Sequence, residues 1–155
     1  MQLSLFDAMP VEAPALDELL RQLGAHDWNR VGAPREKGGT TFHTFRFAAT
    51  DDERELAEGE LPYWVADLDR AAGTYAKRAR ADIGAIEVVI TRQGLSNRVK
   101  SAREQLRHIT DVALRGRVYE ELARAEAVAE ERLTRLERRA AEEERAARPR
   151  AQQAT

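Results

Sequence analysis

Apolar residues recur every three or four positions along much of the chain, which is the spacing of one face of an α-helix. The longest run starts after Pro62 and comprises Val65, Leu68, Ala72, Tyr75, Ala79, Ile83, Ile86 and Ile90. The segment 86–91, taken alone, also has the composition of a strand, so helix and strand both stay open for residues 83–91. A helix is favoured because it continues the run without a break.

Two further helical runs follow. Gly94 interrupts the pattern, and Ser96 or Asn97 is placed to cap a second helix. Its apolar face comprises Leu95, Val99, Ala102, Leu106, Ile109 and Ala113. The short break favours an antiparallel helical hairpin.

After Gly116 a third run comprises Val118, Leu122, Ala125, Ala129, Leu133, Leu136 and Ala140. Its heptad-like spacing allows a homodimer through residues 118–140, although the alanines make a weak coiled-coil seam. A helix that packs on the hairpin, or one that stays exposed, fits the pattern equally well.

The first half of the chain is mixed. Apolar residues at helical spacing predict a short helix over Leu16–Leu23, closed by Gly24. Trp28–Val31 and Thr41–Phe47 predict two strands joined by a turn-rich loop, residues 32–39, that is too long for a tight hairpin. Thr50–Glu53 has the form of a capping box and predicts the start of a short helix.

The N-terminus carries a compact apolar sequence, Gln2-Leu3-Ser4-Leu5-Phe6, followed by residues 8–14, which include two prolines. Proline disfavours a helix and biases the residue before it towards extended conformations. Chain termini are also poorly ordered unless they are tied down. The pentapeptide is therefore expected to be displayed for a partner. The alternative is a first strand or a lid that completes the core.

This pentapeptide resembles the short motif by which bacterial proteins bind the sliding clamp of the replicative DNA polymerase, the DNA polymerase III β subunit. The resemblance covers five residues and says nothing about the fold of the rest. It implies that Leu3, Leu5 and Phe6 fill a clamp pocket, while Gln2 forms hydrogen bonds beside it and small Ser4 passes a narrow wall. Burying three such side chains, less the cost of ordering the peptide, suggests an affinity of about 1 μM.

Composition restricts the fold class and the location. Hydrophobic residues make up 43% of the chain but aromatic residues only 6%, so the core is built mostly from aliphatic side chains, which favours helices. The 34% of charged residues indicates long solvated helical faces. The lack of cysteine excludes disulfides and thiolate metal sites. Neither a leader sequence nor an apolar run of about 20 residues is recognised, so a cytoplasmic location and no membrane contact are expected.

The net charge of −2 conceals a basic middle segment. Residues 67–116 hold 10 basic and 6 acidic side chains, whereas residues 1–66 hold 6 and 12. Two sets of cations lie at helical spacing: Arg70, Lys77 and Arg80 on the first long helix, and Lys100, Arg103 and Arg107 on the second. Such stripes bind phosphate groups without reading bases. The alternative for both stripes is a solvated helix face without a ligand.

A further candidate for DNA contact lies in the predicted loop and strand, where Arg35, Lys37, His43 and Arg46 would form a basic β-ribbon. The alternating pattern places His43, Phe45 and Phe47 on one face of the strand and Arg46 on the other. A solvated loop without a ligand is again the alternative.

Candidate catalytic residues are few. His26, His43 and His108 lack the spacing of metal ligands. Asp67 and Asp69 are two residues apart and face different sides of a helix. Neither a phosphate-binding glycine loop nor a nucleophile elbow is present. We therefore expect no enzyme, no metal and no cofactor, with a nuclease that uses dispersed carboxylates as the alternative.

These patterns predict an α+β fold that is mostly α, with a small two-stranded β element, a long antiparallel helical hairpin and a charged C-terminal helix. The expected organisation is a clamp-binding peptide and linker (1–14), one domain (15–146) and a disordered tail (147–155).

The expected function is that of a non-enzymatic accessory factor that binds the clamp through Gln2–Phe6 and acts near DNA in replication, repair or mobile-element maintenance. The alternative is a DNA-binding regulator of a plasmid, phage or integrative element with no clamp contact.

Overall fold

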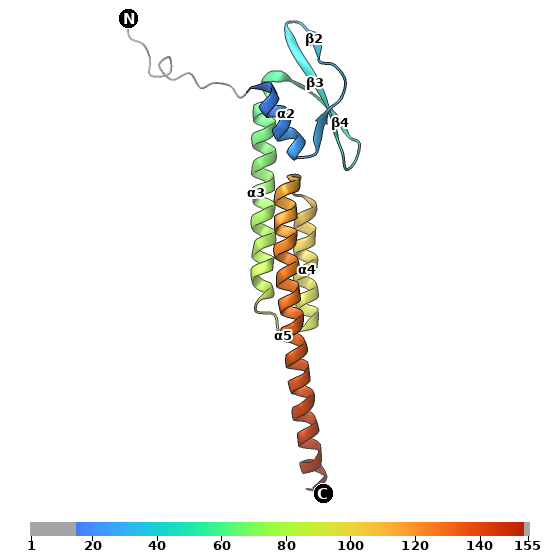
Figure 1. The fold of residues 1–155 in the computed structure, drawn as a ribbon, viewed down its shortest axis with the longest axis vertical. Helices are drawn as coiled ribbons and strands as arrows, with labels where there is room; N and C mark the ends of the chain where they lie inside the picture. Colours follow the sequence, from blue (N-terminus) through green and yellow to red (C-terminus); the bar gives the residue numbers. More distant parts are fainter. Residues whose placement is uncertain (1–14, 154–155) are drawn as a thin grey trace, which may run out of the picture. The chain divides into compact units, whose positions relative to one another are not determined.

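The structure, a computed structural model, describes residues 15–153 (Figure 1), with side chains to residue 148. The helices are α2 (Leu16–Ala25), α3 (Leu61–Ile86), α4 (Arg92–Arg107) and α5 (Val112–Gln153). The strands are β1 (Trp28–Arg30), β2 (Arg35–Lys37), β3 (Thr40–Phe47) and β4 (Glu53–Ala57), and the 3₁₀ turn η1 (Glu58–Glu60) precedes α3. The predicted α+β class with mostly helical content is confirmed.

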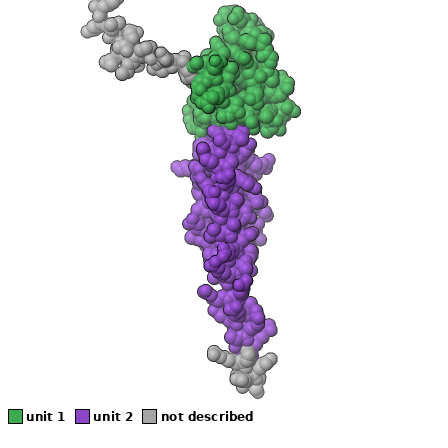
Figure 2. Space-filling model, viewed as in Figure 1, with its two compact units in different colours: residues 1–70 green, residues 71–155 purple. Residues whose placement is uncertain are grey.

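The sequence predicted one domain over residues 15–146, whereas the structure divides into two compact units. Unit 1 ends at Arg70 and unit 2 begins at Ala71, so the residues of α3 are shared between the two (Figure 2). Each unit has its own hydrophobic core.

The sheet of unit 1 is larger than predicted. The two predicted strands are present as β1 and β3, and β3 also pairs with β2 and β4, all antiparallel. Lys37 pairs with Thr40, so only Gly38 and Gly39 connect β2 to β3. Both glycines have positive φ, 58° and 76°, as a tight type I′ hairpin requires. The stretch 32–39, predicted as a loop between the two strands, thus contains strand β2 and this Gly-Gly turn.

The predicted capping box at Thr50–Glu53 is also wrong, because Glu53 begins strand β4. Thr50 Oγ1 accepts a hydrogen bond from the Asp52 backbone N–H (3.3 Å) and donates to Asp52 Oδ2 (2.8 Å). Asp51 between them has φ of 60°, which is a turn conformation and not a helical one. These local bonds form the β3–β4 turn, showing that threonine and aspartate favour turns as readily as helix caps.

Aromatic rings fill the core of unit 1. The Trp64 ring on α3 lies edge-on to Trp28 and Phe45, with centroids 5.0 Å and 5.3 Å away, and Trp28 stacks on Phe47 at 5.0 Å. Leu23 of α2 is fully buried against this group. The predicted inward face of β3, which carries Phe45, is confirmed.

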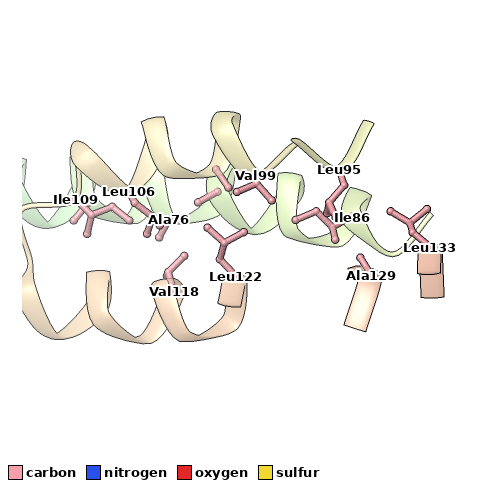
Figure 3. Close-up of a cluster of buried hydrophobic side chains, with 13 residues drawn as sticks. Ala76, Ile86, Leu95, Val99, Leu106, Ile109, Val118, Leu122, Ala129 and Leu133 are labelled. Atoms are coloured by element: carbon pink, nitrogen blue, oxygen red, sulfur yellow. The ribbon is translucent and has the colours of Figure 1, made fainter. Parts of the chain in front are cut away.

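Unit 2 is a three-helix arrangement in which the second part of α3, α4 and α5 lie side by side (Figure 1) and bury one core (Figure 3). Most of the residues in the three predicted apolar runs enter this core. It contains Ala72, Ala76, Ala79, Ile86, Leu95, Val99, Ala102, Leu106, Ile109, Val118, Leu122, Ala129 and Leu133. The third run therefore packs on the hairpin within one chain.

This packing removes residues that a homodimer through 118–140 would need at its interface. Val118, Leu122, Ala129 and Leu133 are buried in the intrachain core, so a seam between two chains cannot use them while that core is intact. Leu136, which is 42% exposed, lies beyond them on α5.

Helix ends differ from the sequence prediction at two places. α4 begins at Arg92, and Thr91 caps it by accepting a hydrogen bond from the Gly94 N–H at 3.0 Å. Gly94 thus lies inside the first turn, and the predicted caps Ser96 and Asn97 were wrong. Gly116 likewise lies inside α5, whose first turn is capped by Asp111 Oδ1 accepting from the Leu114 N–H at 3.0 Å.

The C-terminal end of α5 also differs. A disordered tail was predicted from residue 147, but the helix continues to Gln153. Apart from Pro149, which disfavours a helix interior, residues 147–153 are alanine, arginine and glutamine, which are among the strongest helix formers.

The segment 83–91 is resolved in favour of a helix only as far as Ile86. Arg132 of α5 binds the backbone carbonyls at the point where it stops. Its Nη1 donates to Glu87 O (2.6 Å), and its Nη2 donates to Ile86 O (3.0 Å) and Val89 O (2.9 Å). One guanidinium thus satisfies three carbonyls at the end of α3, where a positive charge also complements the helix dipole.

We expect Arg132→Ala to lower the free energy of unfolding of the protein by about 2 kcal/mol, because three charge-assisted hydrogen bonds are lost. The free energy of unfolding of Arg132→Lys should lie between those of the wild type and Arg132→Ala, since a single ammonium group cannot match the planar guanidinium. Urea denaturation followed by helical circular dichroism measures the effect. The matched control is Arg139→Ala on the exposed side of the same helix, and an equal loss in both variants would contradict this role.

Candidate functional site

The predicted clamp-binding residues Gln2, Leu3, Ser4, Leu5 and Phe6 lie outside the described residues. The first described element, α2, begins at Leu16, two residues after Pro14, and packs its apolar side into the core of unit 1.

The first predicted cationic stripe is used for internal ion pairs. Arg80 binds Glu121 of α5 through two hydrogen bonds, Nε to Oε2 at 3.0 Å and Nη2 to Oε1 at 3.1 Å. Arg70, which lies in unit 1, pairs with Asp67 at 3.0 Å. Lys77 is exposed and has no ion-pair partner within residues 15–148. Arg80 therefore joins α3 to α5 through its contact with Glu121.

The Arg80–Glu121 pair changes the ionisation of both groups. The hydrogen bonds from Arg80 lower the pKa of the Glu121 carboxyl below its usual value of 4.5, and the same contact raises the pKa of Arg80. Both side chains are partly exposed, so the pair contributes little to stability.

The second predicted stripe lies along the groove between α4 and α5. Arg103 is 3.8 Å from Glu126 of α5, and Arg107 is 3.1 Å from Glu104 of its own helix. Lys100 is exposed and lacks an ion-pair partner in the described part of the chain. Each of these contacts is solvent-exposed and of small energy.

Two adjoining hollows follow this groove and share Arg103. The first, of about 400 Å³, is lined by Arg103, Leu106, Arg107, Val112, Arg115, Gly116 and Tyr119. The second, of about 260 Å³, is lined by Arg92, Leu95, Ser96, Val99, Lys100, Arg103, Glu126 and Glu130. We call the two together the α4–α5 groove. Its first hollow combines an apolar floor with three arginines.

Two of the groove residues, Arg115 and Tyr119, were not among the residues that the sequence predicts for a site. Tyr119 is 56% exposed, although an aromatic side chain between two helices would be expected to be buried. Arg115 Nη1 donates to Ile109 O at 3.1 Å, which places its guanidinium beside the α4–α5 loop. In the sequence, their spacing of four residues indicates that both lie on the same side of one helix, next to the third apolar run.

The predicted basic β-ribbon is largely neutralised by strand β4. Arg35 binds Glu55 and Arg46 binds Glu53, each at 2.7 Å. Lys37 stays exposed next to the hairpin turn. The inclusion of His43 in a basic surface was wrong, because its side chain is only 1% exposed and its Nε2 lies 3.3 Å from Glu58 Oε1.

The two aspartates considered for a nuclease have structural partners in unit 1. Asp67 pairs with Arg70, and Asp69 Oδ1 lies 2.7 Å from Nε2 of buried His26. His26 is the C-cap residue directly after α2, so this contact ties the end of α2 to α3. Asp69 thus connects two elements of unit 1, whereas the Asp67–Arg70 pair is an exposed contact within α3.

None of the helices in residues 15–153 has both the length and the apolar character needed to cross a membrane. Comparison with models of protein families, with characterised proteins and with solved structures finds no match to this chain.

The Arg80–Glu121 pair leads to a pH prediction. A carboxylate whose pKa is lowered by folding stabilises the protein above its unfolded pKa, and this contribution disappears as the pH falls through the folded pKa. We expect Arg80→Gln to be less stable than the wild type at pH 7, by at most about 1 kcal/mol. The difference should vanish in acid, below the usual value of 4.5.

Urea denaturation at a series of pH values measures this difference. Arg138→Gln, which removes an exposed charge elsewhere on α5, is the control and should show no such pH dependence. A stability difference between Arg80→Gln and wild type that stays constant down to pH 3 would contradict the assignment.

Proposed function

We propose that this chain is a non-enzymatic accessory factor that binds the bacterial sliding clamp through Gln2–Phe6. The observation that carries the proposal is the pentapeptide itself, with three apolar side chains, a small residue and an amide in the order that resembles the clamp-binding motif. The process served would be replication, repair or mobile-element maintenance, in the cytoplasm.

The position of the motif supports this proposal. The buried core residues that the structure describes in unit 1 run from Leu19 to Val65, drawn from α2, β3 and α3. Residues 7–15 connect the motif to α2, and nine residues span at most about 30 Å when extended. Such a connection is long enough for the peptide to enter a pocket on another protein while unit 1 remains folded beside it.

The rival function is a DNA-binding regulator without clamp contact. The ion pairs of Arg35, Arg46, Arg70 and Arg80 weigh against two of the three cationic groups on which that function would depend. The α4 cations remain as its support, and they are compatible with a clamp-bound factor as well.

We expect Leu5→Ala combined with Phe6→Ala to weaken binding to purified sliding clamp by at least about 100-fold, because two buried apolar side chains are lost. The melting temperature should stay the same, since a displayed peptide contributes little to the core. Biosensor titration and thermal denaturation provide the two measurements.

The matched control is Met9→Ala combined with Val11→Ala, which truncates two apolar side chains just outside the motif. It should bind the clamp as the wild type does. A large fall in the melting temperature of the Leu5/Phe6 variant would show that the pentapeptide belongs to the core and would overturn the proposal.

A further inference from the structure

The α4–α5 groove has features of a binding surface that the clamp motif does not explain. We propose that it binds single-stranded DNA, with the phosphates on the arginines and a base stacked on Tyr119. The biological source of the strand rests on the proposed function, but the site lies wholly in unit 2 and uses none of residues 2–6.

Charge complementarity indicates an anionic occupant. The first hollow has Arg103, Arg107 and Arg115 in its lining and no acidic residue, whereas the second has Arg92 and Lys100 together with Glu126 and Glu130. Arg92 is already held by Glu137 of α5 at 2.9 Å, so the first hollow and Lys100 carry the excess positive charge. The residues Lys100 to Arg107 extend over about 10 Å along α4, at 1.5 Å per residue. The cations therefore form a track along the groove.

The cations can exchange their present partners for phosphate. Arg103 is held by Glu126 only at 3.8 Å, and the Arg107–Glu104 pair is exposed on both sides. Arg115 uses one N–H of Nη1 to bind Ile109 O, and because a guanidinium has five N–H donors, four remain for phosphate. Exposed ion pairs contribute roughly 0–1 kcal/mol, so replacing a carboxylate by a phosphate oxygen has little cost.

The aromatic residue favours a nucleic acid over an acidic peptide, and a single strand over a duplex. Tyr119 is 56% exposed beside the apolar side chains of Leu106 and Val112. An exposed ring next to arginines is the usual arrangement for binding unpaired bases, because every base offers a face for stacking. A base in a duplex is already stacked on its neighbours and cannot reach the ring in this hollow.

The test measures the fluorescence anisotropy of a labelled 15-residue oligothymidine with the full-length protein and no clamp. We expect saturable binding that weakens with salt. Arg103→Gln combined with Arg107→Gln should flatten the slope of log affinity against log salt by about 1.4, since each phosphate contact on a single strand contributes about 0.7.

A second pair of variants tests stacking. Tyr119→Phe keeps the ring and should bind as the wild type, whereas Tyr119→Leu keeps apolar bulk without the ring and should bind about 5- to 100-fold more weakly. Equal binding by the two variants would overturn the assignment of Tyr119. Circular dichroism in the absence of DNA shows whether each variant is folded.

The charge control is Arg138→Gln combined with Arg139→Gln, which removes the same charge from the exposed part of α5. If this control flattens the slope as much as the Arg103/Arg107 variant, the binding is a general charge effect and the groove is not the site. The absence of saturable binding at low salt would also overturn the proposal.

Two competitors distinguish the occupant. Equal displacement of the oligothymidine by a polyglutamate peptide of the same length would show a docking surface for acidic proteins. Tenfold tighter binding of oligouridine would assign the groove to RNA. Clamp binding, measured separately, should be normal in the groove variants, so failure of this inference does not count against the clamp proposal.

Discussion

Helix α3 supplies buried side chains to both hydrophobic cores, and the rest of the described structure depends on this arrangement. Its first turns place Leu61, Trp64 and Val65 in the core of unit 1, and its later turns place Ala72, Ala76, Ala79 and Ile86 in the core of unit 2. The two cores differ in chemistry. Unit 1 uses large aromatic rings over a small sheet, whereas unit 2 uses alanine on α3 against larger aliphatic residues on α4 and α5. Small side chains allow helices to approach closely, so replacing one of these alanines by a larger residue would cause overpacking.

The helices of unit 2 were predictable because their apolar residues repeat over many turns. Their ends were harder to predict, because the end of α3 is bound by a group from another helix and the first turns of α4 and α5 contain glycines that suggested breaks. α3 stops where Arg132, 45 positions away from Glu87, reaches its carbonyl. α4 starts at Arg92, after the cap Thr91, whose side chain accepts a hydrogen bond from the Gly94 N–H, so a glycine that suggested a break belongs to the first turn. In unit 1, the turn at Thr50–Asp52 shows the limit of a local motif, since the same residue types cap helices and close turns.

The charged residues show a similar limit. Spacing alone placed Arg80, Arg103 and Arg107 on helix faces, and that placement is correct. Whether a cation is available to a ligand depends on its partner, and Glu121, 41 positions from Arg80, is brought to it only by the packing of α5 on α3. The packing of α5 on α4 puts Tyr119 and Arg115 beside the α4 cations. Arg115 and Tyr119 both belong to α5, but only the packing of α5 against α4 brings Arg103 and Arg107 to them in the α4–α5 groove.

The two proposed contacts would respond to solution conditions in different ways. The peptide Gln2–Phe6 would bind mainly through apolar burial, which salt does not screen, whereas the α4–α5 groove would bind through phosphate contacts that salt weakens steeply. When both partners are held together, the second contact becomes intramolecular, and avidity can exceed either affinity by roughly 10²–10⁴. A modest affinity at each site is then sufficient for stable attachment. The factor would remain exchangeable wherever the clamp or the single strand is present alone.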